Sequence, residues 1–197
     1  INMNKAMTLT AMQRIEETLP VFADAANACE SLIVHRGHSR YLPLLGSIYL
    51  NWGIPLAHLH RYDTAWEMCH RAVRIFEHLM ENARLLSLAR MRQIACLNRG
   101  EIEIRLGRAR DAVETLEYAL ELNDGPVRTG FPATAGGDRG NILVHLAEAL
   151  AAEGRSDEAR TRLRDGLDLL EDAYARTGHA ECSVQMAWAR ENLGYLL

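Results

Sequence analysis

The strongest constraint in this sequence is a repeat of 47 residues, centred on a segment (98–120) that reads as two amphipathic helices joined at Gly107. Adding or subtracting 47 lands on similar residues, and small residues recur where paired helices must touch. The matching columns are Gly53, Gly100, Ala147 and Gly194; Ala65, Ala112 and Ala159; Cys69, Leu116 and Leu163; and Ala72, Ala119 and Gly166. Self-similarity at a fixed period indicates a helical repeat array. We therefore predict an all-α fold, a right-handed superhelix (α-solenoid) of antiparallel helix pairs.

The period divides the chain into one repeat domain, 1–197, made of successive helix pairs. The predicted segments are a divergent N-terminal pair (1–36, with helices at Asn4–Glu17 and from about Thr18 to His35), helix pairs at 39–82, 84–122 and 139–176, and a single last helix at 179–197. Asp63 and Ser156 are candidate caps at helix starts. Residues 123–138 hold four Gly and two Pro, so we expect a non-helical loop there, serving either in binding or as disordered chain.

Composition limits the class of protein. The net charge is −4, which leaves no basic field for a nucleic acid, and no apolar run is long enough to span a bilayer. The basic residues are 21 Arg and one Lys, a bias typical of bacterial genomes. The four cysteines lack C-x-x-C spacing and favour buried thiols in a reducing, cytoplasmic compartment. Because the chain does not start with Met and ends within a repeat, we expect a piece of a longer protein.

The repeat resembles the tetratricopeptide repeat (TPR) family, whose motif places a Gly and large residues on the first helix and Ala, a large residue and Ala on the second. The matching positions are Tyr49, Trp52, Gly53, Leu56, Ala65 and Ala72; Gly100, Gly107, Ala112, Leu116 and Ala119; Leu143, Leu146, Ala147, Leu150, Gly154, Ala159 and Leu163; and Leu193 with Gly194. His60 replaces the turn glycine, and Arg99 replaces a Leu. The long period is similar to the TPR regions of bacterial MalT-like or Rap-like regulators. The resemblance implies a module that binds a protein or peptide in a concave groove.

Stepping 100° per residue from Gly100 predicts which side chains line that groove. The candidate partner-binding residues are Leu50, Asn51, Ile54, His58, Ile94, Leu97, Asn98, Glu101, Arg105, Val144, His145, Glu148, Trp188, Glu191 and Asn192. One column holds Asn51, Asn98, His145 and Asn192. An amide offers both a donor and an acceptor and can pair with the backbone of an extended ligand. Alternatively, these amides bond a neighbouring repeat and are structural.

Other chemistry is poorly represented. His35 with His38 and His58 with His60 do not form a metal-ligand set, and no phosphate loop or nucleophile with a base is present. We predict no catalytic residues, no metal, no cofactor, no nucleic-acid partner and no membrane partner. The predicted role is a protein- or peptide-binding scaffold or sensor within a bacterial regulatory protein, favouring an amphipathic or mildly basic peptide. The alternatives are homodimerisation through an open apolar face of the last helix (Met186, Trp188, Leu193 and Leu197) and an enzyme with a site in the 123–138 loop.

Overall fold

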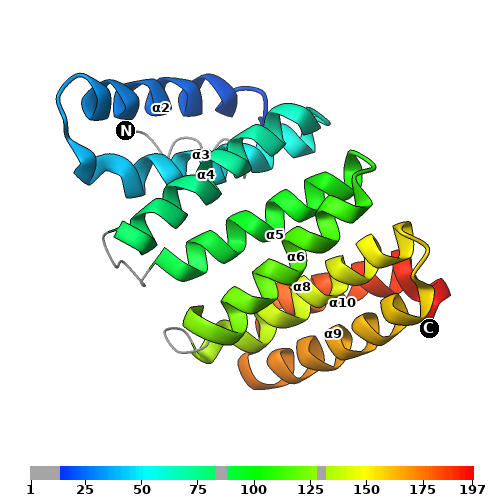
Figure 1. Ribbon diagram of the computed structural model, residues 1–197. Coiled ribbons are helices and arrows are strands. Elements are labelled where there is room, and N and C mark those ends of the chain that lie inside the picture. The colour runs from blue at the N-terminus through cyan, green and yellow to red at the C-terminus, as the bar shows by residue number, and fades with distance from the viewer. Residues whose placement is uncertain (1–13, 83–87, 128–131) are drawn as a thin grey trace. The chain divides into compact units, whose positions relative to one another are not determined.

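The computed structural model describes residues 14–82, 88–127 and 132–197, and within these ranges every regular element is helical (Figure 1). The fold class is all-α, built from antiparallel helix pairs, as predicted. The chain divides into two compact units, Ile1–Ile102 (unit 1) and Glu103–Leu197 (unit 2). The single repeat domain expected from the sequence stays a prediction.

Unit 1 contains one helix hairpin, with one helix before it and another after it in the chain. Its elements are α2 (Thr18–Val34), the 3-10 turn η1 (Ser39–Tyr41), α3 (Leu42–His58), α4 (Tyr62–Asn82) and most of α5 (Ala89–Arg105). Helix α3 packs on α2 and on α4. These bounds match the predicted helices closely, but the end of the predicted first helix at 14–17 is wrong, because these residues form no helix and α2 begins at Thr18. The part of the predicted first helix at 4–13, and the predicted start of α5 at 84–87, lie outside the described residues.

The small residues of the repeat allow α3 and α4 to approach closely. A Cβ atom placed on Gly53 of α3 would lie 2.6 Å from Cys69 Sγ and 3.5 Å from the carbonyl oxygen of Ala65, both on α4. Cys69, Ala65, Ala72 and Phe76 are fully buried. The first, second and third columns of the repeat therefore meet at this hairpin, as their spacing predicted.

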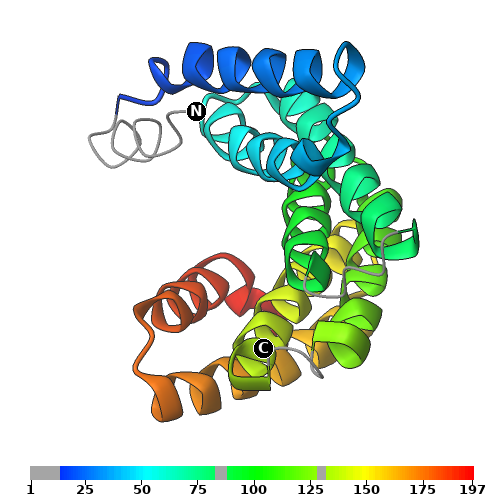
Figure 2. The same ribbon diagram turned by 90° about the vertical axis from the view of Figure 1, so that its left-hand side faces the viewer.

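Unit 2 contains a second hairpin, α8 with α9, and the helices that flank it (Figure 2). Its elements are the end of α5, α6 (Ala109–Leu122), the π-helical turn η3 (Asn123–Val127), α8 (Pro132–Ala152), α9 (Ser156–Thr177), α10 (Ala180–Leu193) and the 3-10 turn η4 (Gly194–Leu196). Helix α8 contacts α6, α9 and α10. Its middle is accordingly buried almost all round: Ile142, Leu143, Leu146, Ala147 and Leu150 are each at most 2% exposed.

The predicted loop at 123–138 is wrong where the structure describes it, because 123–127 form η3 and α8 begins at Pro132. Gly137 and Gly140 of α8 face neighbouring helices rather than forming turns, and only Gly140 allows a close approach. A Cβ on Gly137 would lie 3.5 Å from Cys182 Sγ, and a Cβ on Gly140, just beyond, would lie 2.9 Å from the carbonyl oxygen of Gly166 on α9. Proline at the first position of a helix is favourable, which explains Pro132.

The turns inside the helix pairs repeat the same backbone geometry at the predicted interval. His60, Gly107 and Gly154, each 47 residues from the next, have positive φ angles of 56°, 72° and 81°. In each turn the following amide donates a bond of 2.9 Å to a carbonyl five residues back, as in Arg61 to Leu56. This is the Schellman arrangement that ends a helix in the left-handed region, where glycine is favoured. His60 adopts the same conformation without being glycine.

Two predicted caps are wrong. Helix α4 begins at Tyr62, which places Asp63 inside its first turn. Helix α9 begins at Ser156, so Arg155 occupies its N-cap position, and the Arg155 side chain makes no capping bond. Both acidic first turns still face the positive end of the helix dipole. The four cysteines, by contrast, behave as predicted: all are free and buried. Burial raises the pKa of the Cys29 and Cys182 thiols above the ordinary value.

Candidate protein-interaction site

Five of the predicted groove residues lie together in unit 2. They come from the end of α5 (Arg105), from α8 (His145 and Glu148) and from α10 (Trp188 and Asn192). We call these five residues the Trp188 cluster. The sequence periodicity placed them on one face, and the packing of α10 on α8 brings the two helices that carry four of them into contact.

Ionic and aromatic contacts hold the Trp188 cluster together. Arg105 Nη1 lies 3.0 Å from Glu148 Oε1, and Glu148 Oε2 lies 3.6 Å from His145 Nδ1. The imidazole ring is tilted by 35° against the Trp188 indole, with the ring centroids 5.2 Å apart. Asn192 Nδ2 donates to the carbonyl oxygen of Trp188, at 2.9 Å.

Two polar atoms at the centre of the cluster have no hydrogen-bond partner. His145 Nδ1 and Glu148 Oε2 are both inaccessible to solvent, and their separation of 3.6 Å is too long for a hydrogen bond. Buried polar groups in proteins are nearly always paired, so an unpaired pair of this kind requires an explanation. A donor or acceptor from a bound partner, or a bridging water, would satisfy these atoms after a small movement of the side chains.

Three residues predicted to line the groove are buried instead. Leu50 is 4% exposed, Val144 is 0% exposed and His145 is 5% exposed. The prediction for Leu50 and Val144 as accessible groove residues is wrong, because first helices such as α3 and α8 have neighbours on more than one side. His145 differs from the other two in its unpaired nitrogen and in its contact with Trp188.

In unit 1 the predicted residues are more accessible. Ile54 is 41% exposed and His58 is exposed, while the remaining predicted residues are half-buried: Asn51, Ile94, Leu97, Asn98 and Glu101. Asn51 Nδ2 donates to the carbonyl oxygen of Ser47, at 2.7 Å, within its own helix. Asn98 Nδ2 is buried without a partner. The asparagine column is therefore not uniform: Asn51 and Asn192 bond their own helices, and Asn98 keeps an unused donor.

The predicted open apolar face of the last helix is wrong in its composition. Met186 and Leu193 are 7% and 3% exposed, because α10 packs on α9 and α8. Trp188 is half-buried, and Leu197 is 51% exposed. The face that α10 turns away from its neighbours is a different one.

A stripe of side chains runs along α10 opposite its packed face. Trp188 and Glu191 were among the predicted groove residues, and Trp188 also contacts His145 of α8. The members of the stripe follow helical spacing along α10 into η4, and we call them the α10 stripe: Glu181, Val184, Trp188, Glu191 and Tyr195. Val184 is 63% exposed and Tyr195 is 74% exposed. The spacing of i, i+4, i+7 and i+11 from Val184 was the available signal.

A second polar network lies in unit 1 and joins three helices. Tyr49 of α3 donates to Glu30 of α2, and Arg71 of α4 donates to Tyr49 Oη at 3.4 Å and to Glu67 at 2.7 Å. The Arg71 guanidinium also lies over the Tyr49 ring. Burial and the Glu30 carboxylate raise the pKa of Tyr49 above its ordinary value. Every partner in this network is supplied by the chain, so we interpret it as a brace for the α2–α3–α4 packing.

Two kinds of site are absent from the described residues. In residues 14–82, 88–127 and 132–197, no group of three His, Cys, Asp or Glu side chains is placed to hold a metal ion. In the same ranges, no helix combines the length and the apolar character needed to cross a bilayer.

No protein-family model and no curated protein matches this sequence. Among solved structures, the chain is similar to the MamA RS-1 ArsTM double mutant, with 15% identity, a TM-score of 0.49, and 95% of this chain and 90% of that chain covered. It is also similar to MamA 41-end from Desulfovibrio magneticus RS-1, with 15% identity, a TM-score of 0.39, and coverage of 88% and 93%. We base the interpretation of the site on the contacts within this chain.

Proposed function

We propose that this chain is a protein- or peptide-binding module without enzymatic activity, and that the Trp188 cluster is part of its binding surface. The observation that carries the proposal is the pair of buried, unpaired atoms, His145 Nδ1 and Glu148 Oε2, beside a half-buried indole. Tryptophan is enriched among the residues that dominate binding energy at protein interfaces. Polar atoms left unpaired by the chain itself favour a ligand that pairs them.

The inner side chains of unit 1 form a second candidate surface in this proposal. Its members are the exposed Ile54 and His58 and the half-buried Asn98, whose buried amide nitrogen has no hydrogen-bond partner within the chain. An extended peptide offers backbone acceptors to such an amide. We expect Asn98→Ala to weaken binding of a partner at this surface, and Asn51→Ala to leave it unchanged, because Asn51 already bonds Ser47.

The biological setting is also a proposal. The strong preference for Arg over Lys and the free, buried cysteines support a bacterial, cytoplasmic protein. We propose that the module acts as the sensor or scaffold part of a larger regulatory protein, of the kind the long TPR-like repeat resembles. Association of two copies of the chain is the alternative function.

The test is selection of peptides from an unbiased display library against the full chain. We expect enriched peptides that bind the wild type and lose at least about tenfold in affinity with Trp188→Ala, the loss typical of a dominant interface residue. Tyr174→Ala is the control, because Tyr174 is an aromatic side chain of the same unit, 44% exposed, that lies outside the Trp188 cluster. A selection that enriches no peptide, or peptides equally sensitive to Tyr174→Ala, contradicts the proposal.

A further inference from the structure

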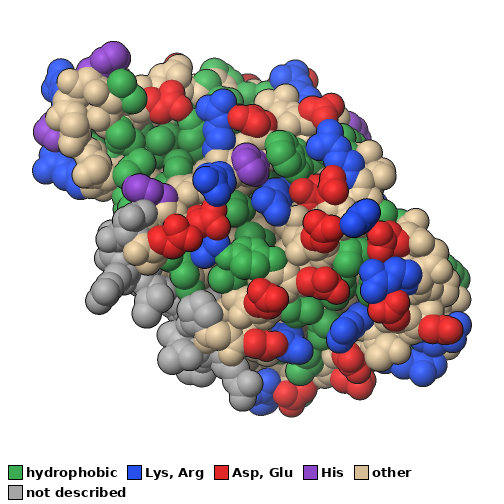
Figure 3. All heavy atoms as spheres, in the orientation of Figure 1, with side chains coloured by type: hydrophobic (Ala, Val, Ile, Leu, Met, Phe, Trp, Pro, Cys, Tyr) green, Lys and Arg blue, Asp and Glu red, His purple; other side chains and the backbone are tan. Residues whose placement is uncertain are grey.

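The two units differ in charge, and the difference bears on what unit 2 binds. Unit 1 contains 11 basic and 9 acidic side chains, and unit 2 contains 11 basic and 17 acidic ones, so their net charges are +2 and −6. The excess in unit 2 is exposed. Acidic and basic side chains are interspersed over the face of unit 2 seen in Figure 3. Ion pairs between them include Arg155 with Glu153 and Arg176 with Asp172.

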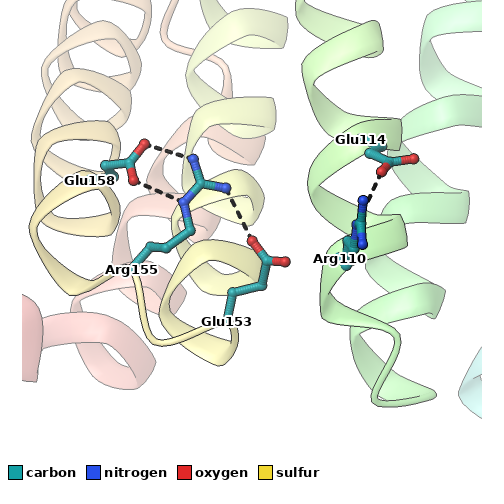
Figure 4. Close-up of polar contacts among 5 residues, drawn as sticks. All are labelled: Arg110, Glu114, Glu153, Arg155 and Glu158. Atoms are coloured by element: carbon teal, nitrogen blue, oxygen red, sulfur yellow. Dashed lines mark hydrogen bonds and ion pairs between the residues drawn. The ribbon is translucent and has the colours of Figure 1, made fainter.

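Most arginines of unit 2 are already paired with a carboxylate of the same unit. The clearest case is Arg155, which bonds Glu158 through two nitrogen atoms and Glu153 through a third contact of 3.1 Å (Figure 4). Arg110 pairs with Glu114, and Arg190 with Glu171. Positive charge is therefore largely neutralised within the unit, and the uncompensated charge belongs to carboxylates.

Two of the uncompensated carboxylates belong to the α10 stripe. Glu181 and Glu191 are exposed, and neither has an ion pair or a side-chain hydrogen bond in the described part of the chain. Between them lie the exposed Val184 and the half-buried Trp188, and the exposed Tyr195 follows. The stripe thus combines an apolar centre with acidic residues ten positions apart, which is about 15 Å along the helix axis.

We propose that the α10 stripe binds a basic amphipathic helix of a partner protein, a conclusion that rests on the proposed function and names its partner. The apolar face of the partner helix packs on Val184, Trp188 and Tyr195. Lys or Arg side chains about ten or eleven positions apart on that helix pair with Glu181 and Glu191. An apolar helical stripe is the surface on which amphipathic helices dock, and its charges select the partner.

The same charges disfavour a second copy of the chain as the occupant. In a two-fold symmetric pair of α10 helices, the stripe meets its own copy, so the only charged groups brought to the contact are carboxylates. Like charges placed against each other at an interface cost free energy. A basic partner reverses the sign of that term.

The first arm of the experiment uses the peptides from the display selection. We expect the enriched sequences to be basic and to carry helical apolar spacing. Peptides that depend on Trp188 but are acidic or neutral would overturn the basic-helix proposal and leave the binding function standing. An empty selection would overturn the binding function itself.

The second arm measures affinity with defined probes. The probes are a designed 15-residue amphipathic helix of Leu, Ala and Lys, and its counterpart with Glu in place of Lys. Emission from Trp188 reports binding in a Trp52→Phe/Trp66→Phe background. We expect the Lys peptide to bind, the Glu peptide to bind at least about tenfold more weakly, and the difference to shrink in 0.5 M salt because exposed pairs are screened.

Matched variants separate the stripe from general electrostatic attraction. Glu181→Gln/Glu191→Gln removes two exposed carboxylates from α10, and Glu117→Gln/Glu121→Gln removes two from α6 that are likewise exposed and unpaired. We expect the first pair to weaken the Lys peptide about fivefold and the second to change it less than twofold. Equal losses from both variants, or a mass in solution showing a dimer that Tyr195→Ser disrupts, would overturn the proposal.

Discussion

The two helix hairpins differ in the kind of atom that faces a glycine where their helices approach closely. In the α3–α4 hairpin of unit 1, Gly53 faces the thiol of Cys69, the free end of a side chain. In the α8–α9 hairpin of unit 2, Gly140 faces Leu170 and the backbone carbonyl of Gly166. A side-chain end can rotate away from an added group, whereas a helix backbone cannot. Two periods separate Gly53 from Ala147 and Gly46 from Gly140, so the two contacts lie at different positions of the repeat. The comparison teaches that the hairpins are closed at different positions, by an adjustable contact in unit 1 and a rigid one in unit 2.

The largest expected effect is at the rigid contact. In Gly140→Ala, the new Cβ would lie 2.8 Å from Leu170 Cγ and 2.9 Å from the Gly166 oxygen, so α8 and α9 must move apart. We expect the free energy of unfolding to fall by about 2–3 kcal/mol, the usual cost of overpacking. Urea denaturation measures it, and Gly194→Ala is the control because nothing lies within 4 Å of its Cβ position. An unchanged midpoint for Gly140→Ala would show that the hairpin is not rigid.

A smaller and reversible effect is expected at the adjustable contact. Gly53→Ala places a Cβ 2.6 Å from Cys69 Sγ, and we expect a loss of about 1 kcal/mol. Adding Cys69→Ala removes the sulfur that clashes. The double variant should then be more stable than the sum of the two single losses predicts, with a coupling of about 1 kcal/mol in a double-mutant cycle. Strict additivity would mean that the thiol does not limit this contact.

In the interhelix turns, substitutions in the two units should change the stability in opposite directions, which sharpens the comparison. His60 and Gly154 occupy equivalent turns with φ of 56° and 81°. Left-handed backbone costs a non-glycine residue roughly 1 kcal/mol, so we expect His60→Gly to stabilise the protein and Gly154→Ala to destabilise it by about that amount. Thermal unfolding followed by circular dichroism measures both. A destabilising His60→Gly would show that the bond between His60 Nδ1 and Tyr62 Oη, at 2.8 Å, outweighs the backbone strain.

The smallest effect concerns the turn of unit 2 and its pH dependence. Hydrogen bonds from Arg155 lower the pKa of Glu158 below its ordinary value. The folded chain therefore binds this proton more weakly than the unfolded chain. The pair stabilises the fold above the ordinary glutamate pKa of about 4.3 and ceases to do so as the pH falls through the lower folded value. Carboxyl NMR titration should show the Glu158 pKa rising toward its ordinary value in Arg155→Gln. An unmoved pKa would show that the pair does not persist in solution.

Periodicity predicted most of the helices because each column of repeated residues corresponds to a contact within a helix pair. The turns at His60, Gly107 and Gly154 and the contact of Gly53 with Cys69 follow directly from the 47-residue spacing. The 123–138 segment was predicted wrongly because Gly and Pro were interpreted as helix breakers. In the structure, Gly137 lies inside α8 and Gly140 allows α9 to approach closely, and only the identity of the neighbouring helix reveals that.

The candidate site was predictable in part for a related reason. Helical phase placed Arg105, His145, Glu148 and Trp188 on one face, and the structure brings them together. Phase alone could not show that Val144 is covered, because burial depends on how many helices surround α8. Glu181 and Val184 of the α10 stripe were not predicted for the same reason: whether Met186 or Val184 faces outward depends on where α9 packs.

Each unit contains at least one buried cysteine whose labelling rate can report how often that unit opens. Cys29, Cys69 and Cys96 lie in unit 1 and Cys182 lies in unit 2, all of them free. A thiol reagent reacts with the thiolate, so a buried thiol waits until its surroundings open. The labelling rate of Cys182 therefore reports the breathing of the α10 region, and the rates of the other three report that of unit 1. Labelling of the wild-type protein, followed by mass spectrometry, can thus measure the opening rates of the two units separately in a single reaction.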